Sequence, residues 1–444
     1  MTKLQTVLAK ARKLVLPGPD EEADLERVAQ KVEAKVEAAA RPYKEIRGVI
    51  LGGSFAKKTW LPKDGENVPD IDLFVKFAKE VDNRTFESIG LKVGKLAARG
   101  YRPGKKYAQH PYTEATVDGV KVNIVPCYDA RPGEWRSAAD RSPYHVEFVR
   151  GSLDEEKRTQ VRLLKRFMKT VGVYGAEIEN EGFSGYAAEV LIYNQGSFEG
   201  ALRFFAGLRP TGETLLSLKD PVDADRELAR AISKGTVARM VLASRAFLAE
   251  PRLAYFTGVT RKTRRGLAPR LYAIRFDHGS ISEDTLWGEL KRSTKQLVRY
   301  VEERGFKIIR ASAASNNSDR SAIILLPETD HLSDLEERVG PEVERSAEVE
   351  RFITKNRERA ELVWAGEDGR VHLLQIRDQT DLGKLLAGVH ARGMESVGAS
   401  REVATAIRKS GRVLAGRALL VEASKERWLS EGIGEIVADS IGTD

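Results

Sequence analysis

The chain has 444 residues, of which 41% are hydrophobic and 31% charged, a composition that excludes an intrinsically disordered protein. A chain of this length predicts more than one domain. Lys and Arg outnumber Asp and Glu by 73 to 65, and the net charge of +8 favours a polyanionic partner such as nucleic acid without establishing one.

The cysteine content and the N-terminus indicate a cytoplasmic protein. A single cysteine, Cys127, excludes an internal disulfide, and no Cys/His spacing resembles a zinc site, which favours a reducing compartment. Lys and Arg interrupt the first 20 residues, so we expect neither a signal peptide nor a membrane span there. No later stretch reaches the ~18 uninterrupted apolar residues that a span needs.

Residues 1–150 are predicted to form a domain in which a helix precedes a small sheet. Four apolar residues recur at helical spacing between Pro19 and Pro42: Leu25, Val28, Val32 and Val36. Two short runs rich in β-branched residues, 46–51 and 71–77, predict strands. After the turn signal Asp118-Gly119 we expect a third strand, in which Val120, Val122 and Ile124 alternate with Lys121 and Asn123.

Residues 151–258 are predicted to form a helical central domain. Its periodic segments run from about Leu153 to Thr170, from Gly185 to about Ile192, and from about Asp225 to Ala249.

Residues 259–444 are predicted to form a C-terminal α/β body and tail. The order strand (271–276), helix (283–304) and strands near Ile308 and 323–326 predicts a βαββ unit like that of an RNA-recognition motif. A hairpin around Asp368-Gly369, helices near Asp381 and Glu402, and a strand at 417–421 complete the chain. The fold class expected for the whole chain is multidomain α+β.

Gly53 and Ser54 directly follow the first predicted strand. Small residues at such a turn let backbone N–H groups approach a phosphate at the start of a helix. The stretch GGSFAKKT lacks the second glycine before the lysine, so it is not a P-loop. Taken alone, Gly-Ser is also typical of an ordinary strand-to-helix turn.

Asp70 and Asp72 lie at the start of the second predicted strand. Because side chains alternate along a strand, both carboxylates project from the same face. Two carboxylates held this close repel each other unless a cation lies between them, and Mg²⁺ shared with substrate phosphates suits such oxygen ligands. The alternative is a pair of solvated acids at a strand end.

Together these motifs resemble a known family. GGSFAKKTWL followed by DIDLFVKF is similar to the head of the polymerase-β nucleotidyltransferase superfamily, and Thr59-Trp60-Leu61 resembles archaeal class I CCA-adding enzymes in particular. Later stretches agree in order: VPCY, RSPYH, VRLLKRF, VYGAE, GFSGYAAEVLIYNQGSF, DPVDADR, LYAIRFD and LWGELK. The resemblance covers nearly the whole chain and implies a polymerase-β-like head.

The resemblance also implies roles for single residues. Gly53 and Ser54 would hold the triphosphate, and Asp70 and Asp72 would bind two Mg²⁺ ions. The nucleotide-binding set would further comprise Lys57, His145, Lys165, Tyr174 and Arg226, with Arg226 reading the base. Lys57 stands where the family commonly has arginine, which exchanges a planar fork for a point charge. From the residues alone, Lys165 and Arg226 are more typical of solvated helix charges.

Asn123 is the largest departure from the family pattern, because the family's strand usually offers a third catalytic Asp there. An amide oxygen can ligate Mg²⁺, so Asn123 is kept in the expected catalytic and metal-binding set with Asp70 and Asp72. It brings no negative charge and cannot accept the proton of an attacking hydroxyl. The departure predicts weaker catalysis and leaves a catalytically silent protein open.

The function implied by the resemblance is template-independent addition of CCA to tRNA from CTP and ATP. The tRNA acceptor stem and 3′ end are the expected partners, with a basic connector as the expected RNA-binding segment: Arg261, Lys262, Arg264 and Arg265. A solvated linker is the alternative for that segment. Rival functions are another template-independent RNA polymerase, such as a poly(A) polymerase, and a silent tRNA-binding protein. A homodimer stays open.

Overall fold

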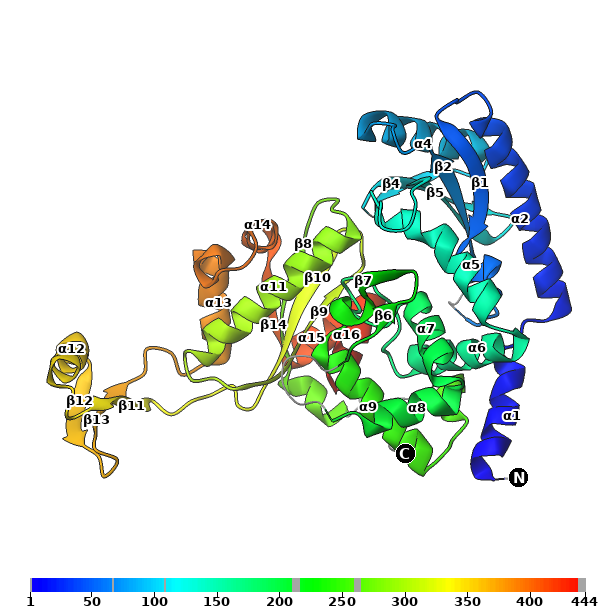
Figure 1. Cartoon of the computed structure of the whole chain (residues 1–444). Coiled ribbons are helices and arrows are strands. Elements are labelled where there is room, and N and C mark those ends of the chain that lie inside the picture. The colour runs from blue at the N-terminus through cyan, green and yellow to red at the C-terminus, as the bar shows by residue number, and fades with distance from the viewer. Residues whose placement is uncertain (1, 66–67, 108, 210–215, 259–264, 438–444) are drawn as a thin grey trace. The chain divides into compact units, whose positions relative to one another are not determined.

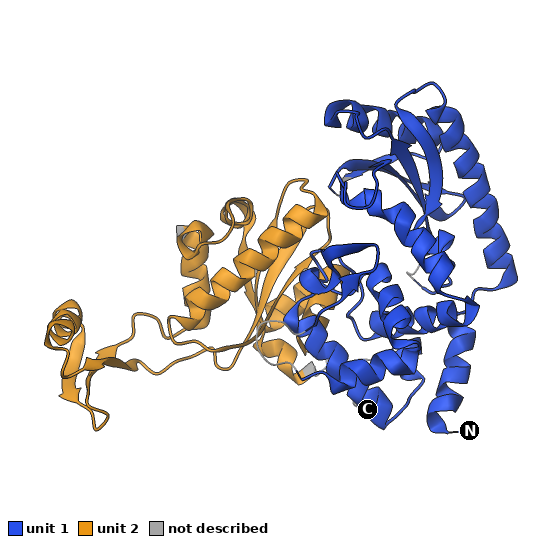
Figure 2. Cartoon of the chain, viewed as in Figure 1, with its two compact units in different colours: residues 1–261, 439–444 blue, residues 262–438 orange. Residues whose placement is uncertain are grey.

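The computed structural model describes residues 2–65, 68–107, 109–209, 216–258 and 265–437. The chain divides into two compact units, residues 1–261 with 439–444 and residues 262–438 (Figure 2). Both units mix helices and strands, which confirms the predicted α+β class. Among the described residues, no helix combines the length and the apolar character that crossing a bilayer requires.

The first unit contains a five-stranded sheet in the order β1-β2-β5-β4-β3 (Figure 1). Its strands are β1 (Ile46–Gly52), β2 (Asp70–Phe77), β3 (Gly104–Tyr107), β4 (Pro111–Val117) and β5 (Val120–Tyr128). β2 and β5 run parallel to each other, and the other neighbouring pairs are antiparallel. The three strands predicted from the sequence are β1, β2 and β5; β3 and β4 were not predicted.

Two helices, α2 (Pro19–Ala40) and α4 (Asn83–Ala97), pack against each other and against this sheet. α2 confirms the helix predicted between Pro19 and Pro42. Along β2 the residues Ile71, Leu73, Val75 and Phe77 are fully buried in the core that these helices cover. The alternation of the strand therefore leaves Asp70 and Asp72 on the opposite face.

A second core in the same unit is helical. Its helices are α1 (Lys3–Val15), α5 (Ser142–Ser152), α6 (Glu155–Thr170), α7 (Gly185–Gln195), α8 (Phe198–Gly207), α9 (Lys234–Ala249) and α10 (Ala254–Thr257). Aromatic rings meet at its centre, with Phe167 stacked on Tyr255 at 5.5 Å between ring centroids. α1, which was not predicted, packs on α6 through this helical core rather than on the sheet.

The helix predicted from about Asp225 to Ala249 is wrong in its first nine residues. The chain instead forms a short hairpin, β6 (Lys219–Asp220) and β7 (Asp223–Glu227), then the 3-10 turn η2 (Leu228–Ala231). The Glu227 carboxylate accepts from the backbone N–H groups of Leu218 and Ala229, which holds this hairpin and turn. α9 begins only after Ser233, whose hydroxyl accepts from Thr236 N–H and caps the helix.

The second unit contains a four-stranded antiparallel sheet in the order β14-β8-β10-β9. The segment β8 (Tyr272–Asp277), α11 (Glu283–Glu302), β9 (Ile308–Ser315) and β10 (Arg320–Pro327) confirms the predicted βαββ order. One sheet face packs on α11, α13 (Leu382–Arg392) and α14 (Arg401–Ser410), with the 3-10 turn η4 (Met394–Val397). The other face packs on α15 (Gly416–Ala423) and α16 (Arg427–Val437), beside the 3-10 turn η3 (Arg265–Arg270).

The strand predicted at 417–421 is wrong, because these residues lie in helix α15. The strand is β14 (Arg412–Ala415), which ends just before them. Gly416 has φ +53°, a conformation that glycine adopts without strain, and the chain turns there from strand to helix. Leu419 and Ala423, four residues apart on one helix face, are buried.

A small three-stranded sheet carries the predicted hairpin around Asp368-Gly369. Its order is β11-β13-β12, with β11 (Leu335–Glu342), β12 (Ala360–Ala365) and β13 (Arg370–Ile376), and with helix α12 (Ser346–Asn356). The hairpin prediction is therefore confirmed.

Candidate active site

A tight turn joins β1 to the short helix α3 (Gly53–Ala56) beside the Asp72 carboxylate. Gly53 has φ +64°, and a Cβ atom added there would lie 1.9 Å from Asp72 Oδ2. Any larger residue would collide with that carboxylate. Glycine is thus required both by the backbone conformation and by the close approach of Asp72.

The sheet register brings Asp72 and Asn123 side by side. Asp70 pairs with Lys121 and Asp72 with Asn123 across the parallel strands β2 and β5. Asn123 Nδ2 donates to Asp72 Oδ1 at 2.9 Å. The structure therefore gathers the three residues that the sequence placed in the catalytic set on one edge of the sheet.

The Asp72 carboxylate is poorly solvated. Burial, and then the negative charge of Asp70, raise the pKa of Asp72 to about 6, against the hydrogen bond from Asn123. A cation between Asp70 and Asp72 would remove that repulsion.

The oxygen atoms present fit a divalent cation. Asn123 Oδ1 is buried and has no hydrogen-bond partner among the described residues, so it offers a free lone pair next to the two carboxylates. Mg²⁺ binds such carboxylate and amide oxygens and completes its shell with water and substrate phosphates. No group of three or more His, Cys, Asp or Glu side chains suited to a metal occurs in the described part of the chain, since the third ligand here is an amide.

Glu189, which the sequence did not single out, is the centre of a buried ionic network next to this turn. It is fully buried in α7 and pairs with Lys57 Nζ at 2.6 Å and with Lys165 Nζ at 2.8 Å. Thr59 Oγ1 donates to Glu189 Oε1 at 2.5 Å and accepts from Lys165 Nζ at 3.0 Å. The network ties the segment after the turn to helices α6 and α7.

The charges of this network shift one another. Burial opposes ionisation of Glu189, but the charges of Lys165 and Lys57 overcome it and hold the pKa of Glu189 at about 2. Burial lowers the pKa of Lys165 to about 8 in spite of Glu189. The prediction of a solvated helix charge at Lys165 is wrong, because its side chain is 2% exposed.

Asp220 is the centre of a second network and was also missed. Its carboxylate accepts from Tyr186 Oη at 2.9 Å and from Arg226 at 3.1 Å, and it lies 3.0 Å from His145 Nε2. The His145 ring stacks on the Tyr186 ring with 3.7 Å between centroids. Asp220 thus joins two residues predicted to contact the nucleotide, His145 and Arg226, although Arg226 lies on β7 and not on a helix.

Asp220 is ionised and His145 is held towards its neutral form. Burial works against the Asp220 carboxylate, but its hydrogen bond to His145 and the charge of that ring hold the pKa of Asp220 at about 2. Burial lowers the pKa of His145, and Asp220 opposes this shift. Asp220 is fully buried, whereas the Arg226 side chain is 38% exposed and keeps further donors open to a ligand.

Tyr174 lies close to Lys165 at the start of α7. A Cβ atom at Gly185 would meet Tyr174 Oη at 2.9 Å and Lys165 Nζ at 3.5 Å, so glycine leaves room for both groups. Burial raises the pKa of the Tyr174 hydroxyl, which keeps it a neutral donor.

The predicted RNA-binding segment lies mostly outside the described residues, which do not include Arg261, Lys262 and Arg264. Arg265 begins the 3-10 turn η3 in the second unit.

A signal in the sequence could have found Glu189 and Asp220. Glu189 is a single charge within a run of α7 that is otherwise apolar, AAEVLI, and a charge buried in this way needs partners. Asp220 opens the motif DPVDADR that also holds Arg226. Their partners lie 24 to 132 residues away from Glu189 and 75 residues away from Asp220 at His145, so only the fold shows the pairing.

Comparisons with known proteins agree with this geometry. Three family models match: a nucleotidyltransferase domain over residues 32–145, the second domain of tRNA nucleotidyltransferase over 159–257, and the C-terminal domain of CCA-adding enzyme over 266–416. The first covers the Gly53 turn and the Asp70, Asp72 and Asn123 cluster. Nucleotidyltransferases take nucleotide substrates with a divalent cation, as the oxygen donors of this cluster also indicate.

Curated relatives match along nearly the whole chain. The CCA-adding enzyme of Pyrobaculum islandicum is 34% identical over 88% of this chain and 95% of its own length. That of Pyrobaculum neutrophilum is 36% identical over 86% and 93%, and that of Methanopyrus kandleri is 30% identical over 98% and 97%. The chain belongs to the family of CCA-adding enzymes, which are tRNA nucleotidyltransferases.

Proposed function

We propose that this protein adds C, C and A in turn to the 3′ end of tRNA, using CTP and ATP, without a nucleic-acid template and with release of pyrophosphate. The observation that carries the proposal is the cluster in which the Gly53 turn, the Asp72 carboxylate and the Asn123 amide meet. The cluster joins a turn able to approach a phosphate to oxygen donors able to hold a cation. The curated name of the relatives supplies the substrate class.

Asp70, Asp72 and Asn123 would hold two Mg²⁺ ions. Bound there, the ions would neutralise charge on the α-phosphate and favour the ionised form of the tRNA 3′-hydroxyl that attacks it. Among the residues of the chain, Asn123 would contribute only an amide oxygen, so the proton of that hydroxyl would have to pass to Asp70, Asp72 or water.

Gly53 and Ser54 would bind the triphosphate through backbone N–H groups. Lys57 and Lys165 together outnumber Glu189, so the buried network keeps a formal charge of +1 next to the turn. A net positive charge held in a poorly solvated place attracts phosphates more strongly than the same charge in water. The network would also fix the segment that follows the turn.

His145, Tyr174 and Arg226 would contact the sugar or the base of the incoming nucleotide. Asp220 orients His145 and Arg226 through hydrogen bonds at 3.0 and 3.1 Å. An arginine with several donors, held by a buried carboxylate, suits recognition of the polar edge of a base.

The domain organisation that accompanies this function is a catalytic head (1–150), a helical neck (151–258) and a tRNA-binding body and tail (259–444). Arg261, Lys262, Arg264 and Arg265 would contact the phosphates of the tRNA acceptor stem. Cytoplasmic location, which the single Cys127 favours, and the oligomeric state stay predictions.

Incubation of the protein with tRNA lacking its CCA end, Mg²⁺ and labelled CTP or ATP tests the proposal. We expect two C residues and then one A, and no addition by the Asp70→Asn, Asp72→Asn double variant. Addition of A alone in long tracts would instead indicate a poly(A)-type polymerase. Tight tRNA binding without any addition would indicate a silent tRNA-binding protein.

A further inference from the structure

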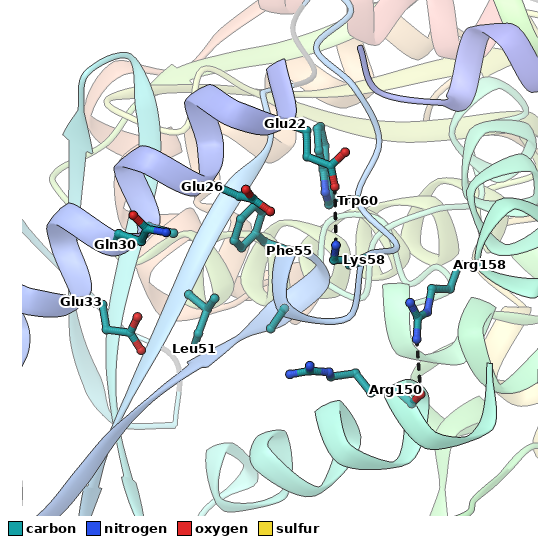
Figure 3. Close-up of a pocket in the computed structure, with 12 residues that line it drawn as sticks. Glu22, Glu26, Gln30, Glu33, Leu51, Phe55, Lys58, Trp60, Arg150 and Arg158 are labelled. Carbon is teal, nitrogen blue, oxygen red and sulfur yellow. Dashed lines mark hydrogen bonds and ion pairs between the residues drawn. The ribbon is translucent and has the colours of Figure 1, made fainter. Parts of the chain in front are cut away.

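A cavity of about 550 Å³ opens beside the turn that follows β1, next to helix α2 (Figure 3). We call it the α2 cavity. Residues of α2, the β1–α3 turn, α5 and α6 line it, and none of them belongs to the proposed catalytic or nucleotide-binding set. Its volume lies within the roughly 300–1,000 Å³ that is usual for small-molecule sites.

One wall of the α2 cavity is acidic. Glu22, Glu26 and Glu33 project from α2 on the side that faces the cavity (Figure 3). Neither Glu26 nor Glu33 forms an ion pair with any residue that the structure describes. Two carboxylates at this wall therefore have no cationic partner.

The opposite wall is basic. Arg150 at the end of α5 and Arg158 on α6 line it, and Arg158 donates to the backbone oxygen of Arg150 at 3.3 Å (Figure 3). Arg158 Nε is buried and has no hydrogen-bond partner within the described ranges. The Arg150 guanidinium is exposed and has no anionic partner among them either. This wall could thus receive an anionic group.

The floor between the walls is apolar. Leu51, Phe55 and Trp60 form it, and the Phe55 and Trp60 rings lie 6.5 Å apart at an interplanar angle of 37°. A flat apolar group gains contact area against such rings.

The segment after the Gly53 turn sends alternate side chains to two different places. Lys57 and Thr59 bond to Glu189 in the buried network, whereas Phe55, Lys58 and Trp60 line the α2 cavity. A ligand in the cavity would therefore not occupy the space proposed for the nucleotide.

We propose that the α2 cavity binds a small zwitterion with a large apolar body, the chemistry of a free aromatic α-amino acid. Its ammonium group lies at Glu26 and Glu33, its carboxylate at Arg150 and Arg158, and its ring against Phe55 and Trp60. A ligand with only one charge would leave the other wall uncompensated, and charge complementarity on both sides gives the site its selectivity. The proposal does not depend on the catalytic assignment.

Isothermal titration calorimetry on the whole chain, without nucleotide or Mg²⁺, tests the site with L-tryptophan as the probe. Tryptamine lacks the carboxylate and indole-3-propionate lacks the ammonium group. We expect L-tryptophan to bind at least about tenfold more tightly than either analogue, because each lost charge pair weakens binding. Addition of CTP with Mg²⁺ should not displace it.

Variants locate the probe. Glu26→Gln with Glu33→Gln should remove the preference for L-tryptophan over indole-3-propionate, and Arg150→Gln the preference over tryptamine. Glu37→Gln, on α2 but outside the lining, should change neither preference. All these side chains lie at the surface or near it, and unchanged unfolding midpoints would verify the fold. Absence of L-tryptophan binding at its solubility limit, unchanged preferences in the variants, or displacement by nucleotide would each overturn the proposal.

Discussion

Asn123 Nδ2 donates a hydrogen bond of 2.9 Å to Asp72 Oδ1, while Asn123 Oδ1 is buried without a partner. In the family pattern this position carries a third carboxylate, which could not donate to Asp72 at neutral pH. The amide lowers the negative charge of the cluster and partly satisfies Asp72. It thereby favours the cation-free protein, and it weakens the pull on a cation.

Asn123→Asp should raise the rate of nucleotide addition by at least about 10²-fold, because a positioned proton acceptor and a stronger cation site are both gained. Single-turnover addition of labelled CTP to tRNA lacking CCA measures the effect. The same variant should unfold at a lower temperature than the parent without Mg²⁺ and gain more from its addition. Equal rates for parent and variant would refute the role given to residue 123.

Asp72→Asn should stabilise the protein at pH 7 when Mg²⁺ is absent, although it should abolish addition. The pKa of Asp72 is about 6 in the folded protein and 3.8 for an unperturbed carboxyl, so its ionised form disfavours folding above pH 6. The cost is absent below pH 3.8 and develops as the pH rises towards 6. We expect a gain of about 1 to 2 kcal/mol in the free energy of unfolding, allowing for solvent near the carboxylate.

Urea unfolding at pH 7 and pH 4, with EDTA present, measures this gain. It should shrink at pH 4, where Asp72 of the parent is protonated in the folded state. A variant less stable than the parent at pH 7 would contradict the poor solvation of Asp72.

Glu189→Gln should destabilise the protein by about 3 to 5 kcal/mol, because it leaves Lys57 and Lys165 buried without their counter-charge. Glutamine keeps the size of the side chain, so lost packing cannot account for the effect. The matched control is Glu199→Gln, which removes the exposed Arg203–Glu199 pair and should cost less than about 1 kcal/mol.

Acid should act on the same network. The pKa of Glu189 is about 2 in the folded protein against 4.5 for an unperturbed carboxyl, so its stabilisation is complete above pH 4.5 and is lost as the pH falls towards 2. Between these pH values the parent should lose more stability than Glu189→Gln. Parallel curves for the two proteins would show that Glu189 is not ionised in the fold.

The sequence predicted the elements that carry the cluster more securely than the networks around it. Strand alternation was enough to place Asp70 and Asp72 on one face, and the register of β2 with β5 then set Asn123 beside Asp72. The Gly53 turn followed from a glycine after a β-branched run. These features depend on residues that are neighbours along the chain.

What the sequence did not predict depends on residues that are distant in the chain. The helical reading of 225–233 failed because the Glu227 carboxylate, by bonding to Leu218 and Ala229, stabilises a hairpin and turn that periodicity cannot show. Lys165 was read as a solvated charge because its partner Glu189 lies on another helix. α15 was read as a strand because RALLV is apolar in both periods, and only the buried pair Leu419 and Ala423 decides for the helix.

Arg226→Ala should harm the selection of CTP and ATP over GTP and UTP more than it harms tRNA affinity. A site that hydrogen-bonds a base discriminates by leaving the groups of a wrong base unpaired, and Ala removes the donors that Asp220 orients. Misincorporation assays with all four nucleotides, beside tRNA binding, measure both effects. Arg230→Ala, an exposed arginine on η2, is the control. Unchanged misincorporation with collapsed tRNA binding would make Arg226 a backbone contact.

Catalysis and RNA holding should separate between the cluster and the basic connector. Asp70→Asn with Asp72→Asn should remove Mg²⁺-dependent addition and leave tRNA affinity equal or slightly higher, because two negative charges near the RNA 3′ end disappear. Neutralising Arg261, Arg264 and Arg265 should weaken binding of every tRNA sequence and flatten the plot of log affinity against log salt by about one unit per lost phosphate contact.

Binding of tRNA by both variants at several salt concentrations, with single-turnover addition at saturating tRNA, decides this last prediction. An Asn123→Asp background provides the signal if addition by the parent chain is too slow to follow. At saturating tRNA the arginine variant should regain most of its rate, since its defect lies in binding, whereas the carboxylate variant should not. A carboxylate variant that lost binding, or an arginine variant that kept the full salt slope, would contradict the separation of the two functions.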